Sequence, residues 1–122
     1  MIANSFEILV PNVPRRWRVV DGRLIQQSVD DGKTWATQYT ADEKTTLLAG
    51  TAAGPATAWL VGRAGAVYVT TDGRTWRHVS FPERADLVAV TAADARTATV
   101  TTADKRAFTT TDAGQTWSAR KN

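Results

Sequence analysis

The chain contains no cysteine and only one histidine, His78. Without cysteine it can form neither a disulfide framework nor a thiolate metal site. A single histidine among scattered carboxylates also supplies too few ligands for a metal cluster, so no metal and no other cofactor is predicted. The absence of cysteine does not identify the cellular compartment, because a chain without cysteine is compatible with oxidising and with reducing environments.

Long apolar runs and runs of like charge are missing too. No stretch approaches the ~18 apolar residues that cross a bilayer, and Glu7 interrupts the short apolar start, which therefore lacks a secretory-signal pattern. A link to a membrane is expected only through a segment of a longer parent protein. The net charge of +3 comes without any Lys/Arg run, which predicts no nucleic-acid partner.

The composition is that of one folded domain. The 122 residues are 43% hydrophobic and 22% charged, which is ordinary for a globular protein long enough to form a core. Alternation typical of strands occurs, as in AVYVT at residues 66–70, and no apolar stripe with a 3.6-residue period is found. The sequence therefore predicts an all-β domain.

The dominant feature is a short motif that occurs three times. It reads SVDDGKTW at residues 28–35, TTDGRTW at 70–76 and TTDAGQTW at 110–117. The final tryptophans are 41 residues apart both times, and periods near this length are typical of stacked units such as propeller blades. The residues that define the motif are Ser28, Asp30, Gly32, Thr34, Trp35, Thr70, Asp72, Gly73, Thr75, Trp76, Thr110, Asp112, Gly114, Thr116 and Trp117.

The repeat extends upstream of each motif. Residues 17–27 parallel residues 59–69, and residues 47–53 parallel residues 87–93. Each unit then holds four short strands, of which the first is rich in small residues, and this predicts β-propeller blades. The predicted blades are residues 5–40, 46–82 and 86–121, with tight turns between their second and third strands at 21–22, 63–65 and 103–105.

Each motif reads as a turn between the third and fourth strands of its blade. The Asp is expected to accept bonds from nearby backbone N–H groups, the Gly to take a positive φ, and the Thr to bond back to the loop. The Trp is expected to enter the core between blades. The second motif has one residue fewer between its Asp and its Gly, so its turn should differ. Calcium binding or catalysis by these aspartates is the alternative, although a lone Asp offers few ligands for a hard cation.

Three blades raise a question of closure. Propellers typically contain ~4–8 blades, so three blades are expected to leave an apolar face bare at each end. The chain is then either part of a larger propeller or half of a homodimer that forms a six-bladed ring around a twofold axis. A purely structural role, in which these blades complete a longer propeller, is a third reading.

The motif resembles the Asp box, or BNR repeat, of sialidases, sortilin-type receptors and photosystem II assembly factors. Residues 61–73, followed by Trp76, Pro82 and the strand 87–90, resemble the photosystem II stability/assembly factor-like repeat. Residues 16–18 and 86–104 are similar to the C-terminal part of bacterial membrane-anchored, anti-sigma-like proteins. The resemblance implies a non-catalytic domain for protein interaction, sensing or scaffolding, with a periplasmic or extracellular location and an unidentified protein or glycan partner.

The competing function is that of a sialidase-like glycoside-binding or glycosidase fragment. Such chemistry needs three arginines that converge on a carboxylate, a Tyr nucleophile with a Glu beside it, and an Asp as acid/base. Arg15, Arg16 and Arg18 lie too close together in the sequence to converge from one strand, and Tyr39 and Tyr68 have no Glu nearby. His78 is interpreted as a surface residue. No catalytic residue is predicted, and no phosphate-binding glycine motif precedes a helix.

A possible binding rim is predicted on the edge opposite the motifs. There the turns between second and third strands and the connections between blades are expected to gather around the channel mouth. A net-basic rim could attract an acidic partner. The predicted rim residues are Arg23, Lys44, Arg63, Arg84, Lys105 and Arg106, together with the carboxylates Asp42, Glu43, Glu83 and Asp104.

Overall fold

The computed structural model describes residues 5–10, 13–42 and 44–120, which form three four-stranded antiparallel sheets. Glu43 and residue 121 of the predictions above lie outside these ranges. No helix within them is long and apolar enough to cross a membrane. The elements are β1 (Phe6–Leu9), β2 (Arg16–Val20), β3 (Leu24–Ser28), β4 (Ala36–Thr40), β5 (Leu47–Gly54), β6 (Thr57–Gly62), the 3₁₀ turn η1 (Arg63–Gly65), β7 (Val67–Thr70), β8 (Arg77–His78), β9 (Leu87–Ala92), β10 (Ala98–Thr102), β11 (Ala107–Thr110) and β12 (Ser118–Arg120).

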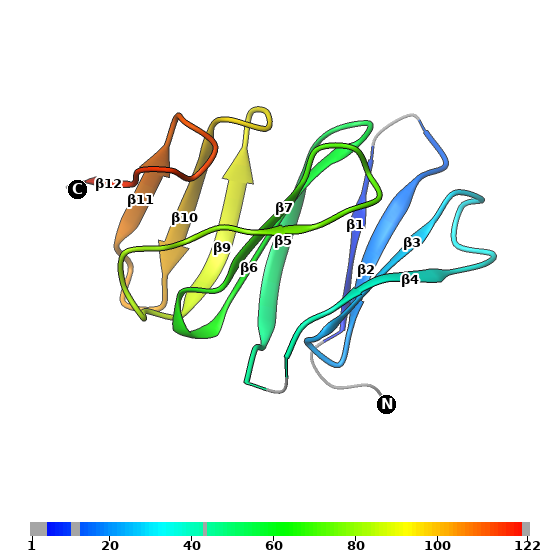
Figure 1. Cartoon of the computed structure of the whole chain (residues 1–122), viewed down its shortest axis with the longest axis horizontal. Helices are drawn as coiled ribbons and strands as arrows, with labels where there is room; N and C mark the ends of the chain where they lie inside the picture. The colour runs from blue at the N-terminus through cyan, green and yellow to red at the C-terminus, as the bar shows by residue number, and fades with distance from the viewer. Residues whose placement is uncertain (1–4, 11–12, 43, 121–122) are drawn as a thin grey trace.

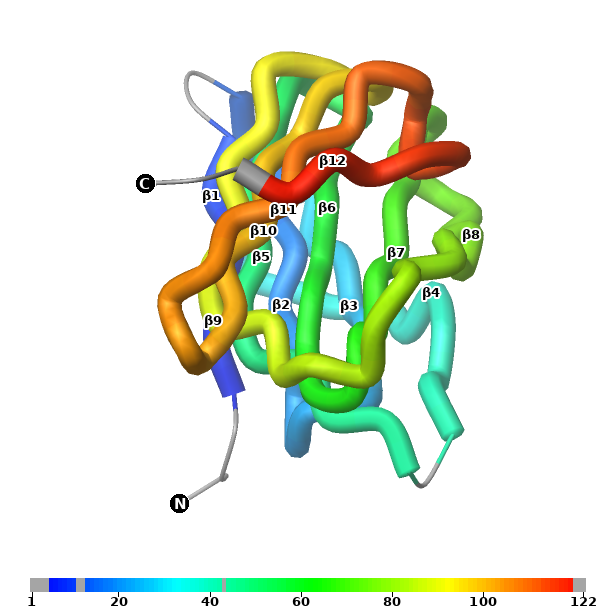
Figure 2. Tube along the Cα trace, turned by 90° about the vertical axis from the view of Figure 1, so that its left-hand side faces the viewer, coloured from blue at the N-terminus to red at the C-terminus, as the bar shows by residue number. Residues whose placement is uncertain are grey.

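The three sheets are the blades of a propeller. In each sheet, every strand pairs with the next one along the chain, and the sheets are here named blade 1 (β1–β4), blade 2 (β5–β8) and blade 3 (β9–β12). They stand side by side in chain order (Figure 1). The first strands β1, β5 and β9 lie on one side of the stack, and β4 and β8 on the other (Figure 2). The predicted all-β fold of propeller blades is confirmed.

Blade 2 is buried on both faces because it has a neighbour on each side. Its strand β6 is buried from residue 58 to residue 62, and β7 is buried throughout. Leu60 and Tyr68 face blade 1, whereas Trp59 and Val67 belong to the core on the side of blade 3. Adjacent residues of a strand point to opposite faces, so a strand buried on both sides is apolar at nearly every position.

The seam between blades 1 and 2 centres on two tryptophans. Trp17 of β2 is fully buried, and its ring meets that of Trp76 edge to face, with centroids 6.0 Å apart and an interplanar angle of 84°. This geometry suits two aromatic quadrupoles. Gln38 of β4 accepts hydrogen bonds from both indole N–H groups, at 3.3 Å from Trp17 and 3.0 Å from Trp76, and its amide donates to the carbonyl of Gly73 at 2.8 Å.

The seam between blades 2 and 3 repeats this arrangement with other partners. Trp59 and Trp117 meet edge to face, with centroids 6.3 Å apart and an angle of 85°. The indole of Trp59 donates to the carbonyl of Asp94 at 3.1 Å, and that of Trp117 to the carbonyl of Ser80 at 3.1 Å. Backbone carbonyls thus take the place of the Gln38 amide in this seam.

The two outward faces of the stack carry polar side chains beside apolar ones such as Leu9, so the expectation of bare apolar faces holds only in part. On blade 1, Arg18 lies opposite Glu7 on one side and Gln26 on the other, and its Nε donates to the Gln26 amide oxygen at 2.6 Å. On blade 3, the hydroxyls of Thr99 and Thr109 are hydrogen-bonded at 3.0 Å. The three blades are therefore not equivalent, because the first and third carry polar side chains at outward positions that are apolar in blade 2.

Candidate functional site

The loops of the domain gather at two opposite edges, as predicted. The second and third motifs lie at the upper edge of Figure 1 and the first at its right-hand end, and together they form what we call the box edge; the predicted rim lies along the lower edge. Across the rim, the N–H of Leu47 donates to the carbonyl of Gly22, that of Gly65 to Ala85, and that of Ala103 to Asp86. These bonds join the turns of neighbouring blades to the connections between them, so the rim is one continuous surface.

Each box is a closed network around one aspartate. In the first box, the Ser28 hydroxyl donates to Asp30 at 2.7 Å and accepts from the N–H of Gly32 at 2.8 Å. The backbone N–H and hydroxyl of Thr34 both donate to the same carboxylate, at 2.9 and 2.6 Å. The other boxes repeat these bonds through Thr70, Asp72, Gly73 and Thr75 and through Thr110, Asp112, Gly114 and Thr116.

The second box turns differently, as its shorter sequence predicts. In boxes one and three, two successive residues have positive φ: Asp31 and Gly32 at 62° and 86°, and Ala113 and Gly114 at 63° and 88°. In box two only Gly73 does, at 73°. The aspartate of that box compensates by accepting from two backbone N–H groups, those of Arg74 and Thr75, at 2.8 and 2.9 Å.

The carboxylates of the boxes are occupied by donors from their own loops. Both oxygens of Asp30 and of Asp72 accept hydrogen bonds within the turn. Among the described residues, no group of three His, Cys, Asp or Glu side chains is placed to hold a metal ion. The geometry is that of a turn held together by its aspartate.

Two of the three box tryptophans enter a seam, and one does not. Trp76 and Trp117 reach the preceding blade. Trp35, predicted to do the same, instead donates its N–H to the carbonyl of Gly32 in its own box at 3.1 Å, and the guanidinium of Arg18 lies 4.2 Å from its ring centroid. No described blade precedes blade 1, so this indole folds back onto its own sheet.

The box hydrogen bonds lower the pKa values of the three aspartates and make stability depend on acid pH. The Thr34 hydroxyl bond lowers the pKa of Asp30, the Thr75 backbone N–H lowers that of Asp72, and the Thr116 hydroxyl lowers that of Asp112 to about 2. A carboxyl with a lowered pKa in the folded state stabilises the fold above its unfolded value of 3.8, and this contribution is lost as pH falls through the folded value.

We therefore expect the free energy of unfolding to drop steeply between about pH 4 and about pH 2. Urea titrations at a series of pH values measure it. An Asp112→Asn variant should be less stable at neutral pH and show a shallower acid dependence than the parent protein. A free energy of unfolding that stays constant from pH 5 to pH 2 contradicts this account of the boxes.

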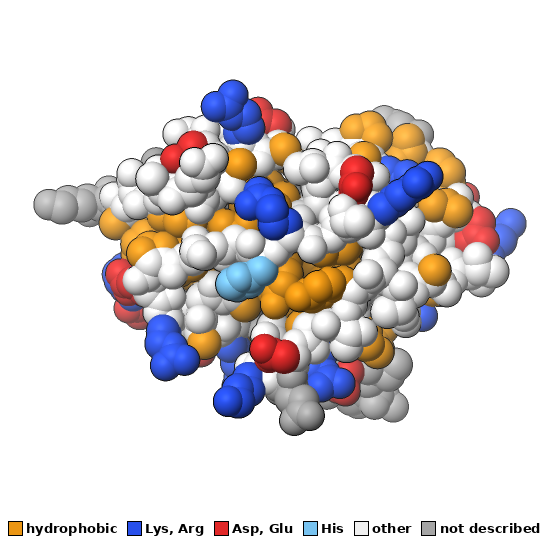
Figure 3. Space-filling view, viewed as in Figure 1, with side chains coloured by type: hydrophobic (Ala, Val, Ile, Leu, Met, Phe, Trp, Pro, Cys, Tyr) orange, Lys and Arg blue, Asp and Glu red, His pale blue; other side chains and the backbone are white. Residues whose placement is uncertain are grey.

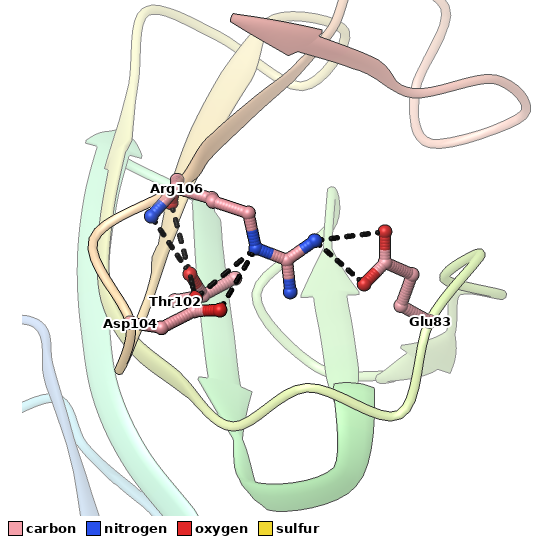
Figure 4. Close-up of polar contacts among 4 residues, drawn as sticks. All are labelled: Glu83, Thr102, Asp104 and Arg106. Atoms are coloured by element: carbon pink, nitrogen blue, oxygen red, sulfur yellow. Dashed lines mark hydrogen bonds and ion pairs between the residues drawn. The ribbon is translucent and has the colours of Figure 1, made fainter. Parts of the chain in front are cut away.

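The rim is where the structure brings charged groups together. Arg106 lies between two carboxylates, its Nη1 at 2.8 Å from Glu83 and its Nε at 3.0 Å from Asp104 (Figure 4). The Thr102 hydroxyl donates to Asp104 as well. Arg106 thus ties the turn between β10 and β11 to the connection between blades 2 and 3, and its charge is balanced locally.

The other predicted rim cations are placed differently. Within the described parts of the chain, none of them makes an ion pair. The rim carboxylates Asp42 and Asp86 are engaged by the chain itself, with the N–H of Lys44 at 2.9 Å from Asp42 and that of Ala64 at 3.0 Å from Asp86. Figure 3 shows Lys and Arg side chains along this lower edge. The residues in question are Arg23, which is half-buried, and Lys44, Arg63, Arg84 and Lys105, which are exposed.

The three clustered arginines do not converge on one point. Arg15 donates to the carbonyl of Pro55 at 2.8 Å, Arg16 lies 3.6 Å from Glu7 and 3.5 Å from Asp31, and Arg18 covers Trp35. They face three different surroundings, whereas a carboxylate-binding triad needs one.

The aromatic side chains named as candidates form a separate cluster. The ring of Tyr68 lies 5.3 Å from that of Tyr39 and 5.2 Å from that of His78, and burial raises the pKa of the Tyr68 hydroxyl. Raising the pKa of a tyrosine works against its use as a nucleophile. His78 is exposed, as predicted.

Gln38 is the residue that sequence reasoning missed. Its side chain links the two tryptophans of the first seam to the second box through hydrogen bonds. It nevertheless lies in a mostly polar strand, ATQYT, that contains no recognisable motif. The repeat was the one sequence signal for its burial, because Gln38 lies 41 residues before Val79, which is buried.

Comparison with known proteins gives a consistent result. A sequence model of the family described as photosynthesis system II assembly factor YCF48 matches residues 5–122. None of the curated proteins matches the sequence. A structure described as YCF48 bound to D1 peptide is similar, with a TM-score of 0.79 and 18% identity over 93% of this chain and 38% of that chain.

YCF48 from Cyanidioschyzon merolae is similar too, with a TM-score of 0.69 and 20% identity over 94% of this chain and 42% of that chain. At these identities the structural likeness shows the propeller fold. The chain spans about two fifths of the length of each of these two structures.

Proposed function

Because this chain belongs to the photosynthesis system II assembly factor YCF48 family, we propose that it is a non-catalytic protein-interaction propeller whose rim binds an acidic segment of a partner. The related YCF48 is described as bound to a peptide of D1, which supports a peptide as the kind of partner. It does not extend to D1 itself, since this chain covers only a part of that protein.

The observation that carries the proposal is the presence of exposed arginines on the rim whose donors are not used within the described residues. Asp42, Asp86 and Asp104 accept hydrogen bonds within the rim, whereas the guanidinium groups of Arg63 and Arg84 are exposed and make no ion pair within the described residues. The hydrogen-bonded carboxylates keep their negative charge, but their oxygens are engaged within the chain, whereas the two guanidinium groups use none of their N–H donors on the described residues and have them available to a partner's carboxylates.

Reversing two of these charges is expected to abolish binding. The double variant Arg63→Glu, Arg84→Glu should lose the capture of partner from host extract by immobilised protein, and wild-type capture should itself weaken as salt rises through 0.1 M, where the Debye length is about 10 Å. Quantitative mass spectrometry of the captured proteins measures both effects.

The matched control places the same charge change on the box edge. Lys33 and Arg74 are exposed there, so Lys33→Glu with Arg74→Glu alters the net charge equally and leaves the rim intact. Equal capture by the rim variant and this control contradicts the rim as the binding surface. A partner that is a glycan instead of a protein would show as capture that survives protease treatment of the extract.

A sensing role outside the cytoplasm is part of the proposal. It is supported only by the resemblance of residues 16–18 and 86–104 to anti-sigma-like proteins. Recovery of the parent protein in the cytoplasmic fraction of its host would contradict it. The sialidase-like alternative is disfavoured by the dispersal of Arg15, Arg16 and Arg18, and hydrolysis of a fluorogenic sialoside above background would support that alternative.

We infer, further, that a second copy of the chain completes the propeller as a six-bladed ring. Three blades are fewer than the ~4–8 of closed propellers. A twofold pair of three-blade halves is the smallest assembly that gives both outward faces a neighbour.

A further inference from the structure

The two seams inside the chain are one interface used twice. In the first, Trp17 of blade 1 packs in the same core cluster as Leu60 of blade 2. In the second, Trp59 of blade 2 packs with Val100 of blade 3. The register confirms the equivalence, because Trp17 lies opposite Gln27, Trp59 opposite Val69, and Thr99 opposite Thr109 in their respective blades. Any further blade added in this way would meet the outward faces at equivalent positions.

The outward face of blade 3 is built from smaller residues than its counterparts. Thr99 stands where blade 2 has Trp59, Thr101 where it has Val61, and Ala107 where it has Val67. A hollow of about 270 Å³ lies at this face, and Thr91, Ala92 and Thr97 line it together with Thr99. The side chains of this face are smaller than those of blade 2, and several of them end in hydroxyl groups.

The outward face of blade 1 differs in the opposite sense. Arg16 stands where blade 2 has Ala58, Arg18 where it has Leu60. Trp35 also lies on this side, half-buried, at the position from which Trp76 and Trp117 reach the preceding blade. These side chains are larger than their counterparts in blade 2 and carry hydrogen-bond donors, and they stand beside a hollow of about 380 Å³ that Glu7 and Arg18 line.

From this complementarity we propose that two copies of the chain dock head to tail, the outward face of blade 1 of each copy on the outward face of blade 3 of the other. The inference rests on the proposed six-bladed ring and assigns its contacts. Trp35 enters the hollow beside Thr99, and the arginine donors of blade 1 meet the threonine hydroxyls of blade 3. The large side chains of one face fill the space that small side chains leave on the other, as in a protein interior.

The decisive contact is that between Arg18 and Thr99 of different copies. They occupy the positions of Leu60 and Trp17 in the first seam, which share a core cluster. Thr99→Arg alone sets two arginines against each other, and Arg18→Glu alone removes the donor, so each should weaken dimerisation at least about tenfold. When the two variants are mixed, one contact pairs arginine with glutamate and the other is that of the wild type, so a dimer should form again.

The experiment is light scattering behind size exclusion over a concentration series, with wild type, each variant, their mixture and the box-edge variant Arg74→Glu as control. Wild type and control should approach twice 13.2 kDa, the single variants 13.2 kDa, and the mixture twice that mass again. Circular dichroism and thermal melting establish that each variant is folded.

Three results would overturn the proposal: a wild-type mass of 13.2 kDa throughout, a dimer that neither variant affects, or a mixture that stays monomeric. A dimer that neither variant affects would still allow a ring closed through other faces. That result would therefore reject these contacts without rejecting the ring. If the Arg63→Glu, Arg84→Glu protein loses partner capture but keeps the dimer mass, partner binding by the rim is independent of the ring and of these contacts.

Discussion

Replacing Trp59 with alanine is expected to lower the free energy of unfolding by about 3–5 kcal/mol, the cost of removing a large aromatic side chain from a core that cannot collapse around the gap. Trp59 is fully buried in the middle blade, packs against Trp117 and donates to the carbonyl of Asp94. A domain of this size is stable by roughly 0.05–0.15 kcal/mol per residue, so the loss takes a large part of the total. Urea unfolding at fixed protein concentration measures it.

The same substitution at Trp35 is the matched control. Its indole donates to Gly32 of its own box and lies under Arg18, and it enters neither seam of the described residues, so Trp35→Ala should cost about 1 kcal/mol, near the usual value for a point mutation. A Trp35→Ala loss equal to that of Trp59→Ala would contradict the seam as the place where stability resides. A Trp35 cost that appears only at concentrations where the chain dimerises would agree with the head-to-tail assembly.

The repeat is what made the fold readable from sequence. Three copies of one turn at a fixed period define the blade, because each blade buries its faces by stacking on the next. The box geometry was equally predictable, since an Asp, a Gly and a Thr at this spacing have few ways to satisfy the backbone donors of a tight turn. What the repeat conveys is the average blade.

Departures from the average blade were not predictable. Arg18 and Thr99 occupy positions that are apolar in the other blades, and a sequence read for its common pattern treats them as noise. Arg106 and Glu83 were both assigned to the rim, but their ion pair was not predictable, because they lie 23 residues apart and only the folded chain brings them into contact. The departures at Arg18 and Thr99 lie in blades 1 and 3 and face away from blade 2, where the pattern common to the repeats does not indicate which neighbour a side chain meets.

An added methyl group at Gly62 should strongly destabilise the fold. Gly62 ends β6 and lies against the connection between blades 1 and 2, and a Cβ built there would come 2.0 Å from the carbonyl oxygen of Thr46 and 2.7 Å from the Cα of Leu47. These are backbone atoms held by the bond from Arg63 N–H to the Thr46 carbonyl at 2.8 Å. Gly62→Ala is therefore expected to destabilise the fold by about 3 kcal/mol or more, at the upper end of what overpacking costs.

Gly54, near the opposite end of the same sheet, provides the comparison. A Cβ there would meet nothing nearer than the Cβ of Thr57 at 4.0 Å, and the φ of Gly54 is not in the left-handed region. Gly54→Ala should be neutral or stabilise by about 0.4–1 kcal/mol, because alanine reduces the freedom of the unfolded chain. Melting curves of the two variants show whether any substitution of a strand glycine destabilises the fold, or only one that clashes with the connection at Thr46 and Leu47. Equal melting temperatures would mean that the connection moves aside at Gly62, and that the seam between blades 1 and 2 is set by its tryptophans and Gln38 instead of by this close backbone approach.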